Sequence, residues 1–381
     1  MRGAPLRLAW QILAHRRGRL AAGSAAVALA VLIMFMELGF FHGFSDSQAL
    51  LPPRFEADLV LMDWRRVHLN EWTELPALRL AQVAALPGVA EVVPVYNTAM
   101  TLRDPLTRQL RSINTLAFPP DSQALRVPGL AELAGRLKVR GNVLFDARSR
   151  AIYGPVTEGT LVTLENRPPL RVAGFFELGP NFSHDGTLLM GEGTYLAATG
   201  RPPGAPVDFA LVRLRPGLEV ATFRRQLLAA LPPDTIALTP EEMRRREVAY
   251  TATVVPTGII FGLALAVGFV IGVIVCYQVL FNEITDHLPQ FATLQAMGFG
   301  DGFLRRIVLH QAWLVAVIGF GPGLAGGWWL YVELERRTGI VMEQTPGRVA
   351  FVFGLTLLMS FAASLLALRR ATQSDPAEVF A

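Results

Sequence analysis

Four long apolar runs constrain this chain more than any other feature of its sequence. A transmembrane helix needs roughly 20 predominantly apolar residues to cross about 30 Å of hydrocarbon, and each run is long enough without a Lys, Arg or Asp. Hydrophobic residues make up 52% of the 381 positions and charged residues only 17%, which is too apolar for a soluble protein. The sequence therefore predicts a membrane protein with four spanning helices, over residues 20–41, 253–281, 305–332 (opened by two arginines) and 349–368.

The segment before the first run, residues 1–19, is rich in arginine. Leu6, Trp10 and Leu13 recur there at helical spacing, which predicts an amphipathic helix lying on the inner membrane surface. The run that follows exceeds the apolar core of a signal peptide, about 7–15 residues. We therefore expect it to be a retained anchor.

Residues 42–252, between the first and second spans, have mixed composition and are numerous enough for one folded domain outside the bilayer. Short β-rich stretches alternate there with helical ones, which predicts an α+β fold. A short loop, 333–348, and a tail, 369–381, complete the chain. The clearest strand patterns cover 92–96, 160–164, 170–176 and 209–214, and the clearest helical patterns cover 78–86 and 221–231.

Arginine clusters orient the spans. They lie before the first span, at the start of the third and after the fourth. With four crossings, all of these positions are on the same side of the membrane. The positive-inside rule assigns that side to the cytoplasm. Arg244, Arg245 and Arg246 argue the other way, but long domains translocate largely regardless of charge. We expect a bacterial inner-membrane protein with both termini in the cytoplasm and the large domain in the periplasm. Topology also accounts for the net charge of +4 without nucleic acid.

No motif for catalysis is present. The sequence lacks GxxxxGK[ST], HExxH and GxSxG, so we predict no catalytic, cofactor or metal residue. The single cysteine, Cys276, falls within the second span and forms neither a disulfide framework nor a thiolate metal site within one chain. The pair His184-Asp185 lies in the turn-like sequence GPNFSHDG, and we interpret it as structural.

Polar and small residues within the spans are interpreted as packing features. Glu37 lies near the outer end of the first span, where an interfacial or interhelical role is favoured over a substrate or proton contact. His310 and Gln311 receive the same interpretation. Glycines at four-residue spacing suit close helix packing, either within the chain or across a dimer. The candidates are Gly258, Gly262, Gly268, Gly272, Gly319 and Gly323.

The segment between the second and third spans, residues 282–304, predicts a short amphipathic helix. Asp286 suits an N-cap, Pro289 a first turn and Gly298 a C-terminal stop. Such a helix docks in a cytoplasmic partner and transmits its motion, or it merely joins two spans, and the pattern alone leaves both open. The candidate coupling residues are Asp286, His287, Leu288, Pro289, Phe291, Leu294, Met297 and Gly298.

The chain resembles the FtsX/MacB family of ABC transporter permeases, and within it the DevC-type permeases of glycolipid exporters. The resemblance covers nearly the whole chain, in seven ordered segments. They are LAW with MFMELGF (8–10, 34–40), LFDARSRAIYGP (144–155), VAGFFELGPNFSHDG (172–186), VRLRPG (212–217), DHLPQFATLQAMGF (286–299) and DPAEVF (375–380).

This resemblance implies one span, a large periplasmic domain and then three spans. It implies a dimer of permeases bound to two copies of a separate, DevA-like ATPase through segment 282–304, so that the chain is not itself an enzyme. A DevB-like membrane-fusion adaptor and a TolC-like outer-membrane duct are the further partners expected. The periplasmic domain would relay ATP-driven motion, called mechanotransmission, to export an amphipathic or lipid-like molecule.

Export has two alternatives. An FtsX-like signalling subunit would use the same motion to activate a periplasmic cell-wall hydrolase without transporting anything. An intramembrane or periplasmic enzyme lacks a convergent catalytic set in this sequence.

Overall fold

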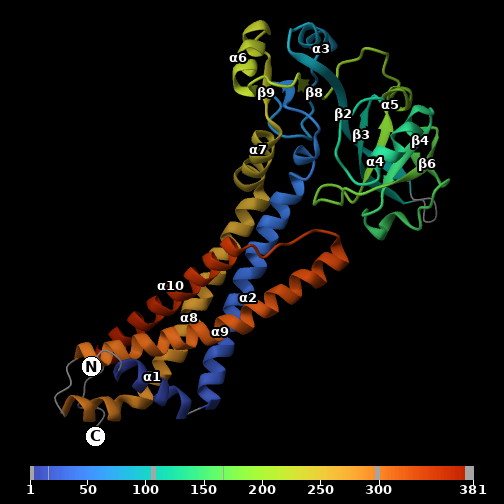
Figure 1. Ribbon diagram of the computed structural model, residues 1–381. Helices are drawn as coiled ribbons and strands as arrows, with labels where there is room; N and C mark the ends of the chain where they lie inside the picture. Colours follow the sequence, from blue (N-terminus) through green and yellow to red (C-terminus); the bar gives the residue numbers. More distant parts are fainter. Residues whose placement is uncertain (1–3, 16, 104–108, 166, 297–300, 374–381) are drawn as a thin grey trace. The chain divides into compact units, whose positions relative to one another are not determined.

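A computed structural model describes residues 4–15, 17–103, 109–165, 167–296 and 301–373 (Figure 1). The chain divides into two compact units, and each is described by itself. The helical unit comprises Met1–Phe41, Ile259–Leu334 and Met342–Ala381, and the α+β unit comprises His42–Gly258 and Glu335–Val341.

Four helices of the described chain are long and apolar enough to cross a membrane, which confirms the four predicted spans. Their apolar windows fall within Leu20–Gln48, Gly258–Val279, Arg305–Thr338 and Pro346–Arg369. The helix predicted before the first span is present as well. The helices of these regions are α1 (Ala4–His15), α2 (Arg17–Gln48), α8 (Pro256–Ala296), α9 (Asp301–Thr338) and α10 (Pro346–Gln373).

All four spanning helices are longer than the hydrocarbon core of a bilayer, and two of them, α2 and α9, end in the α+β unit. α2 has 32 residues and α9 has 38, which at 1.5 Å per residue gives lengths of about 50 Å and about 57 Å. The hydrocarbon core measures only about 30 Å. Both helices therefore continue beyond their apolar runs, and their last turns belong to the α+β unit.

The core of the helical unit is formed by side chains from α2, α8, α9 and α10. Phe35 of α2 is fully buried, and its ring centroid lies 6.1 Å from that of Phe320 of α9. The ring of Phe320 packs in turn against Phe353 of α10, with centroids 4.9 Å apart. The Tyr331 hydroxyl of α9 donates to the carbonyl of Phe35. Aromatic packing and this bond join three of the spans.

A nine-stranded sheet organises the α+β unit, in the order β3-β7-β4-β6-β5-β2-β8-β1-β9. Because β2 also pairs with β3, the strands β3-β7-β4-β6-β5-β2 form a closed ring, while β2-β8-β1-β9 form an open sheet. The strands are β1 (Leu59–Asp63), β2 (Val89–Arg103), β3 (Leu110–Phe118), β4 (Asn142–Asp146), β5 (Leu161–Leu164), β6 (Pro169–Phe176), β7 (Thr187–Gly191), β8 (Phe209–Leu214) and β9 (Thr235–Leu238).

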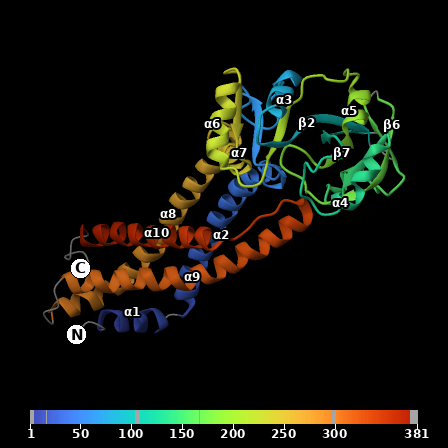
Figure 2. The ribbon, with the colours of Figure 1, turned by 45° about the horizontal axis from the view of Figure 1, so that its top comes forward.

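β2 joins the two parts of this sheet. Its first half, through Val95, pairs with β8, and its second half, from Tyr96, pairs with β3. Figure 2 shows the ring strands with α4 and α5 on one side of β2, and α3, α6 and α7 on the other. The helices of this unit are α3 (Ala77–Ala84), α4 (Leu130–Leu133), α5 (Glu192–Thr199), α6 (Val220–Ala230) and α7 (Pro240–Thr253).

The strand and helix patterns read from the sequence are confirmed. Residues 92–96 lie in β2, 160–164 overlap β5, 170–176 lie in β6 and 209–214 are β8. The patterns at 78–86 and 221–231 become α3 and α6. Together with the four apolar helices, these elements give the expected class, a membrane protein with an α+β domain inserted between the first and second spans.

α7 begins with strong local signals. Thr239 and Glu242 form a capping box, in which the Glu242 N–H donates to Thr239 Oγ1 at 3.2 Å and the Thr239 N–H donates to Glu242 Oε2 at 2.9 Å. Arg244 and Arg245, two of the three arginines that weighed against the predicted orientation, both pair with Glu241. Their charge is therefore partly balanced within α7.

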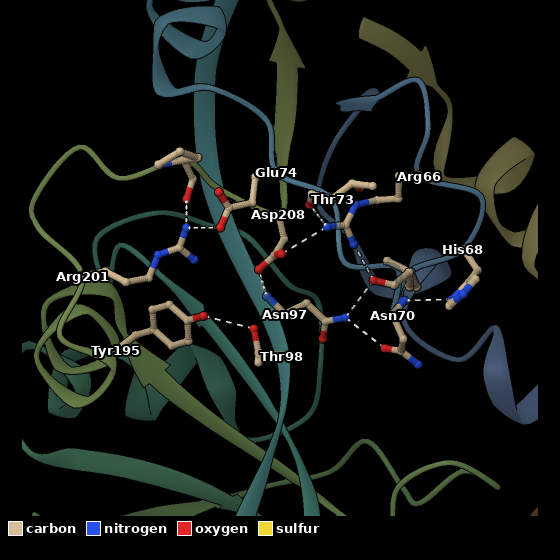
Figure 3. Close-up of polar contacts among 12 residues, drawn as sticks. Arg66, His68, Asn70, Thr73, Glu74, Asn97, Thr98, Tyr195, Arg201 and Asp208 are labelled. Atoms are coloured by element: carbon tan, nitrogen blue, oxygen red, sulfur yellow. Dashed lines mark hydrogen bonds and ion pairs between the residues drawn. The ribbon is translucent and has the colours of Figure 1, made fainter. Parts of the chain in front are cut away.

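A buried ion pair lies where β2 passes from the open sheet to the ring (Figure 3). Arg66 is fully buried, and its Nη2 lies 3.1 Å from Asp208 Oδ1. The other Asp208 oxygen accepts the backbone N–H of Asn97 at 2.8 Å, immediately after the last β2–β8 pair. Arg66 also donates to the carbonyls of Leu69 and Thr73. The Arg66–Asp208 pair thus connects β2, the start of β8 and the loop between β1 and α3.

Replacing Arg66 by Met tests this joint. The Arg66→Met variant leaves the Asp208 carboxylate buried without its partner, and removing one member of a buried pair costs ~3–5 kcal/mol. We expect a large fall in Tm of the detergent-solubilised full chain. Arg126→Met is the matched control, because the Arg126 side chain is 79% exposed in its ion pair with Glu56 and exposed pairs contribute little. Equal Tm values for the two variants would refute a stabilising role for the Arg66–Asp208 pair.

Candidate functional site

The predicted coupling segment does not form a separate helix. α8 runs from Pro256 to Ala296 as one helix, so the prediction of an N-cap at Asp286 is wrong. A proline within a helix can bend it without ending it, and Figure 1 shows the last turns of α8 running across the direction of the rest. Six of the eight candidate residues, from Asp286 to Leu294, lie in this part of α8. Met297 and Gly298 lie outside the described residues.

The candidate packing glycines divide into two kinds. A Cβ at Gly319 would meet the carbonyl oxygen of Ser24 at 2.7 Å, and one at Gly323 would meet that of Ala28 at 2.8 Å, so α9 lies directly against α2. Gly272 lies against Met359 and Ala30, and Gly268 against Ile33. These four pack within the chain. At Gly262 no described atom lies within 4 Å of the added Cβ, and Gly258 meets only backbone of residues 251 and 252.

The polar residues expected within the spans occupy different surroundings. Glu37 is half-buried in α2. Gln311 is 1% exposed, and its Nε2 has no hydrogen-bond partner among the described residues. His310 Nδ1 is paired with the carbonyl of Arg306, one turn earlier in α9. The structure does not bring these three side chains together.

The last turns of α2 are anchored in the α+β unit by the loop between β6 and β7, residues 177–186, which we call the junction loop. Phe44 packs edge-on against Phe182 with ring centroids 5.0 Å apart, and Gln48 Nε2 donates to Ser183 Oγ. The buried Asp146 fixes the start of this loop by accepting the N–H groups of Leu178 and Gly179.

The end of α9 meets the same loop. Arg150 Nε donates to the carbonyl of Thr338, the last residue of α9, at 3.1 Å, and Nη2 donates to the carbonyl of Asn181 at 3.3 Å. Arg150 also pairs with Asp185. A cation at a helix C-terminus interacts favourably with the helix dipole. The junction loop therefore connects the ends of the first and third spans.

α7, which leads into the second span, is held by the loop between β1 and α3. The Leu69 N–H donates to Glu247 Oε1 at 2.6 Å, and His68 stacks on Tyr250 with centroids 4.7 Å apart. Glu247 is 5% exposed. Burial raises the pKa of Glu247 to about 7, against the lowering effects of the Leu69 N–H and nearby Arg246 and Arg66.

The His184-Asp185 pair has a structural environment, as interpreted from its turn sequence. Asp185 pairs with Arg150, and the His184 N–H donates to Asn181 Oδ1 at 2.6 Å. Burial lowers the pKa of His184, with a smaller opposing effect from Asp185. Among the described residues no group of three or more His, Cys, Asp or Glu side chains could hold a metal ion.

Sequence reasoning did not single out Arg66, Arg150 or Glu247. Each is one charged residue among many in a mixed sequence, and its partners Asp208, Thr338 and Leu69 are 142, 188 and 178 positions away. No local spacing connects residues so far apart.

Comparison with known proteins finds a family similar to the last three spans. Residues 257–376 match the family described as FtsX-like permease C-terminal, a range that takes in α8, α9 and α10. The macrolide export ATP-binding/permease protein MacB 1/2 of Paracoccus denitrificans (strain Pd 1222) is 23% identical over 310 residues, covering 78% of this chain and 44% of that protein. The chain therefore spans less than half the length of this relative.

Two solved structures are similar to the chain in part. The periplasmic region of MacB from Actinobacillus actinomycetemcomitans has a TM-score of 0.36 and 10% identity, covering 50% of this chain and 92% of that one. The extracellular domain of the ABC-type transporter YknZ from Gram-positive bacteria has a TM-score of 0.32 and 13% identity, covering 47% and 98%.

The C-terminal spans match an FtsX-like permease domain. Together with the MacB relative, this match shows that part of the chain is similar to permeases of FtsX and MacB type.

Glycine substitutions separate the two kinds of packing. In Gly323→Ala the new Cβ would overlap the α2 backbone, and overpacking of this kind costs ~1–3 kcal/mol. We therefore expect a lower Tm for the solubilised chain. Gly262→Ala is the matched control, since nothing described lies near its Cβ, and we expect its Tm to be unchanged. A lower Tm for Gly262→Ala alone would contradict this assignment.

The Glu247 carboxyl predicts a pH-dependent stability. Because folding raises its pKa from 4.5 to about 7, its stabilising contribution is complete below pH ~4.5 and is lost as pH rises through 7, by roughly 3 kcal/mol in all. Glu247→Gln should remove this loss. We expect the Tm difference, variant minus native, to increase between pH 6 and pH 8.5.

The control for Glu247 is Glu241→Gln on the same helix. Pairing with Arg244 lowers the pKa of Glu241 to about 2, so its charge does not change over that pH range. A difference that stays constant with pH for both variants would rule out titration of Glu247.

Proposed function

We propose that the chain is the membrane subunit of a MacB-like ABC exporter, in which ATP hydrolysis by a separate ATPase moves an amphipathic or lipid-like molecule outward. The observation that carries this proposal is the FtsX-like permease match over residues 257–376, which includes the segment between the second and third spans. The ATPase would dock at that segment, residues 282–304, and bind the ATP and Mg. The 381 residues contain no GxxxxGK[ST] loop of their own.

The anchored span ends support transmission of motion to the α+β unit. The last turns of α2 contact the junction loop, and the end of α9 is linked to it through Arg150. α7, which precedes α8, is bound by Leu69 and His68. Three of the four spans are thus tied to this unit by specific side chains. A displacement of these spans, driven from the cytoplasmic side, would therefore move the α+β unit, which is the mechanotransmission proposed here.

The membrane orientation is part of the proposal. Both termini would lie in the cytoplasm and the α+β unit in the periplasm of a bacterial inner membrane, in line with the positive-inside rule. A second permease copy, a DevB-like adaptor and a TolC-like duct would complete the exporter. A DevC-type glycolipid cargo is one member of the proposed substrate class.

Co-purification tests the assembly. The tagged chain would be recovered from detergent-solubilised membranes and its partners identified by mass spectrometry. An ABC ATPase with a membrane-fusion adaptor is the expected result. An ATPase with a cell-wall hydrolase would make the chain a signalling subunit of FtsX type, and the absence of any ATPase would overturn the proposal.

Charge substitutions test the docking segment. Phe291→Asp and Leu294→Asp place a carboxylate on the apolar face expected from the sequence, and burying a charge against a partner is strongly unfavourable. We expect at least a tenfold loss of co-purified ATPase, with membrane insertion unchanged. Gln290→Asp adds the same charge at a polar position and should retain the ATPase. Full recovery with both apolar-face variants would exclude this segment as the docking site.

A further inference from the structure

The loop between β1 and α3, residues 64–76, exposes large apolar side chains, and we call it the tryptophan loop. Trp72 is 93% exposed and Trp64 is 57% exposed, and Val67 is exposed as well. Tryptophan is highly buried on average, because covering about 150–250 Å² of ring surface is strongly favourable. Single apolar residues scattered over a surface are ordinary. Two tryptophans and a valine on one short loop indicate a contact surface.

The tryptophan loop is held firmly on both sides of Trp72. The buried Arg66 donates to the Thr73 carbonyl (Figure 3). Two residues further on, the Leu75 N–H donates to the Val207 carbonyl at 2.7 Å and the Val207 N–H donates to the Leu75 carbonyl at 2.9 Å. The fold itself therefore presents the indole of Trp72 to the surroundings, and a partner would bind it with little loss of backbone freedom.

The end of the first span lies close to this loop. Leu69 and Asn70 line a polar cavity together with Ser47 and Gln48, the last two residues of α2. On the same helix, Gln48 comes seven residues after Phe41, where the first apolar run ends. Seven residues of helix rise about 10 Å. The tryptophan loop thus approaches α2 about 10 Å beyond the apolar run.

The start of the second span gives a second, independent measure. His68 of the tryptophan loop stacks on Tyr250 of α7 with centroids 4.7 Å apart. Tyr250 comes eight residues before Gly258, where the second apolar window begins. At the helical rise this separation is about 12 Å. Two different spans therefore place the loop at a similar height above the hydrocarbon core.

This height brings Trp72 within reach of the lipid headgroups. A bilayer is about 30 Å thick in its hydrocarbon core and about 40–45 Å thick with its headgroups, which leaves a layer of about 5–8 Å on each side. Trp72 is two residues from Asn70, and two residues of extended chain span up to about 7 Å. Tryptophan is enriched in this layer, because its ring is apolar and its N–H is polar.

The charges around Trp72 favour shallow contact through the indole. Glu71 and Glu74 lie on either side of it in the sequence, where Glu71 Oε2 is 3.2 Å from His68 Nε2 and Glu74 pairs with Arg201. Carboxylates are tolerated among headgroups and excluded from hydrocarbon. Adsorption by charge alone uses clusters of Lys and Arg on anionic lipid, which these two glutamates oppose. A neutral lipid surface suits the loop better.

We propose that Trp72 and Trp64 insert into the lipid headgroup layer, so that the tryptophan loop anchors the α+β unit on the membrane surface. The partner is the bilayer itself. This anchor would brace the loop that also binds α7 through Leu69 and His68. The proposal rests on the four spans and does not depend on export, so it stands even if the co-purified partners are those of a signalling subunit.

Spin labels at the two tryptophans test the proposal. Trp72→Cys and Trp64→Cys would each be labelled with a nitroxide in the full chain and reconstituted in phosphatidylcholine nanodiscs. Paramagnetic resonance then compares collisions of the label with O₂, which concentrates in lipid, and with a water-soluble nickel chelate. The native Cys276 is buried, and the unsubstituted chain taken through the same labelling gives the background.

Leu218→Cys is the matched control. Leu218 is an exposed apolar residue of the same unit, but it lies past the opposite end of β8. That strand begins at Phe209, next to the Asp208 partner of Arg66, and ends at Leu214. The five steps between its ends cover about 17 Å. A label at 218 should therefore report water.

We expect the ratio of O₂ to nickel collisions to be several-fold higher at 72 and 64 than at 218. Ratios at 72 and 64 equal to that at 218 would overturn the proposal. Labels at 72 and 64 that collide with neither reagent would overturn it as well, because they would be covered by protein, such as a second copy of the chain. Two label positions keep the test valid if one variant fails to fold.

Discussion

The Arg66–Asp208 ion pair is the interaction on which the α+β unit depends. β2 leaves β8 after Val95 and joins β3 from Tyr96, so β8 offers no strand partner to the backbone N–H of Asn97. Asp208 supplies the missing acceptor, and Arg66 balances the resulting buried charge. Without Asp208 the junction between the open sheet and the ring would bury an unpaired N–H, and without Arg66 it would bury a carboxylate that lacks its counter-charge.

The same region explains how membrane helices and a β-rich unit become mechanically connected. The loop that carries Arg66 also carries Leu69 and His68, which bind α7 ahead of the second span. The junction loop binds the end of the first span, and Arg150 links it to the end of the third. A few named side chains of the α+β unit thus hold the span ends.

Several elements followed from the sequence because their signals are local. The apolar runs became spans, and the stretch 209–214 became β8. Thr239 and Glu242, three positions apart, form the capping box of α7. The separate coupling helix failed as a prediction, because a cap signal at Asp286 and a proline at 289 compete with a long helix already propagating from Pro256. Helix propagation is favourable once nucleated, so a local stop signal need not end it.

The sequence by itself determined the membrane class, the number of spans and the α+β content, since each depends on composition and period along short stretches. Only the tertiary structure decided which glycines face a neighbouring helix and which loops hold the span ends. It also decided which residues line a polar cavity in the α+β unit, Gln48, Asn114 and His184 among them. These features depend on contacts between residues far apart in the chain, which the long-range pairing of β2, β3 and β8 brings together and no local pattern encodes.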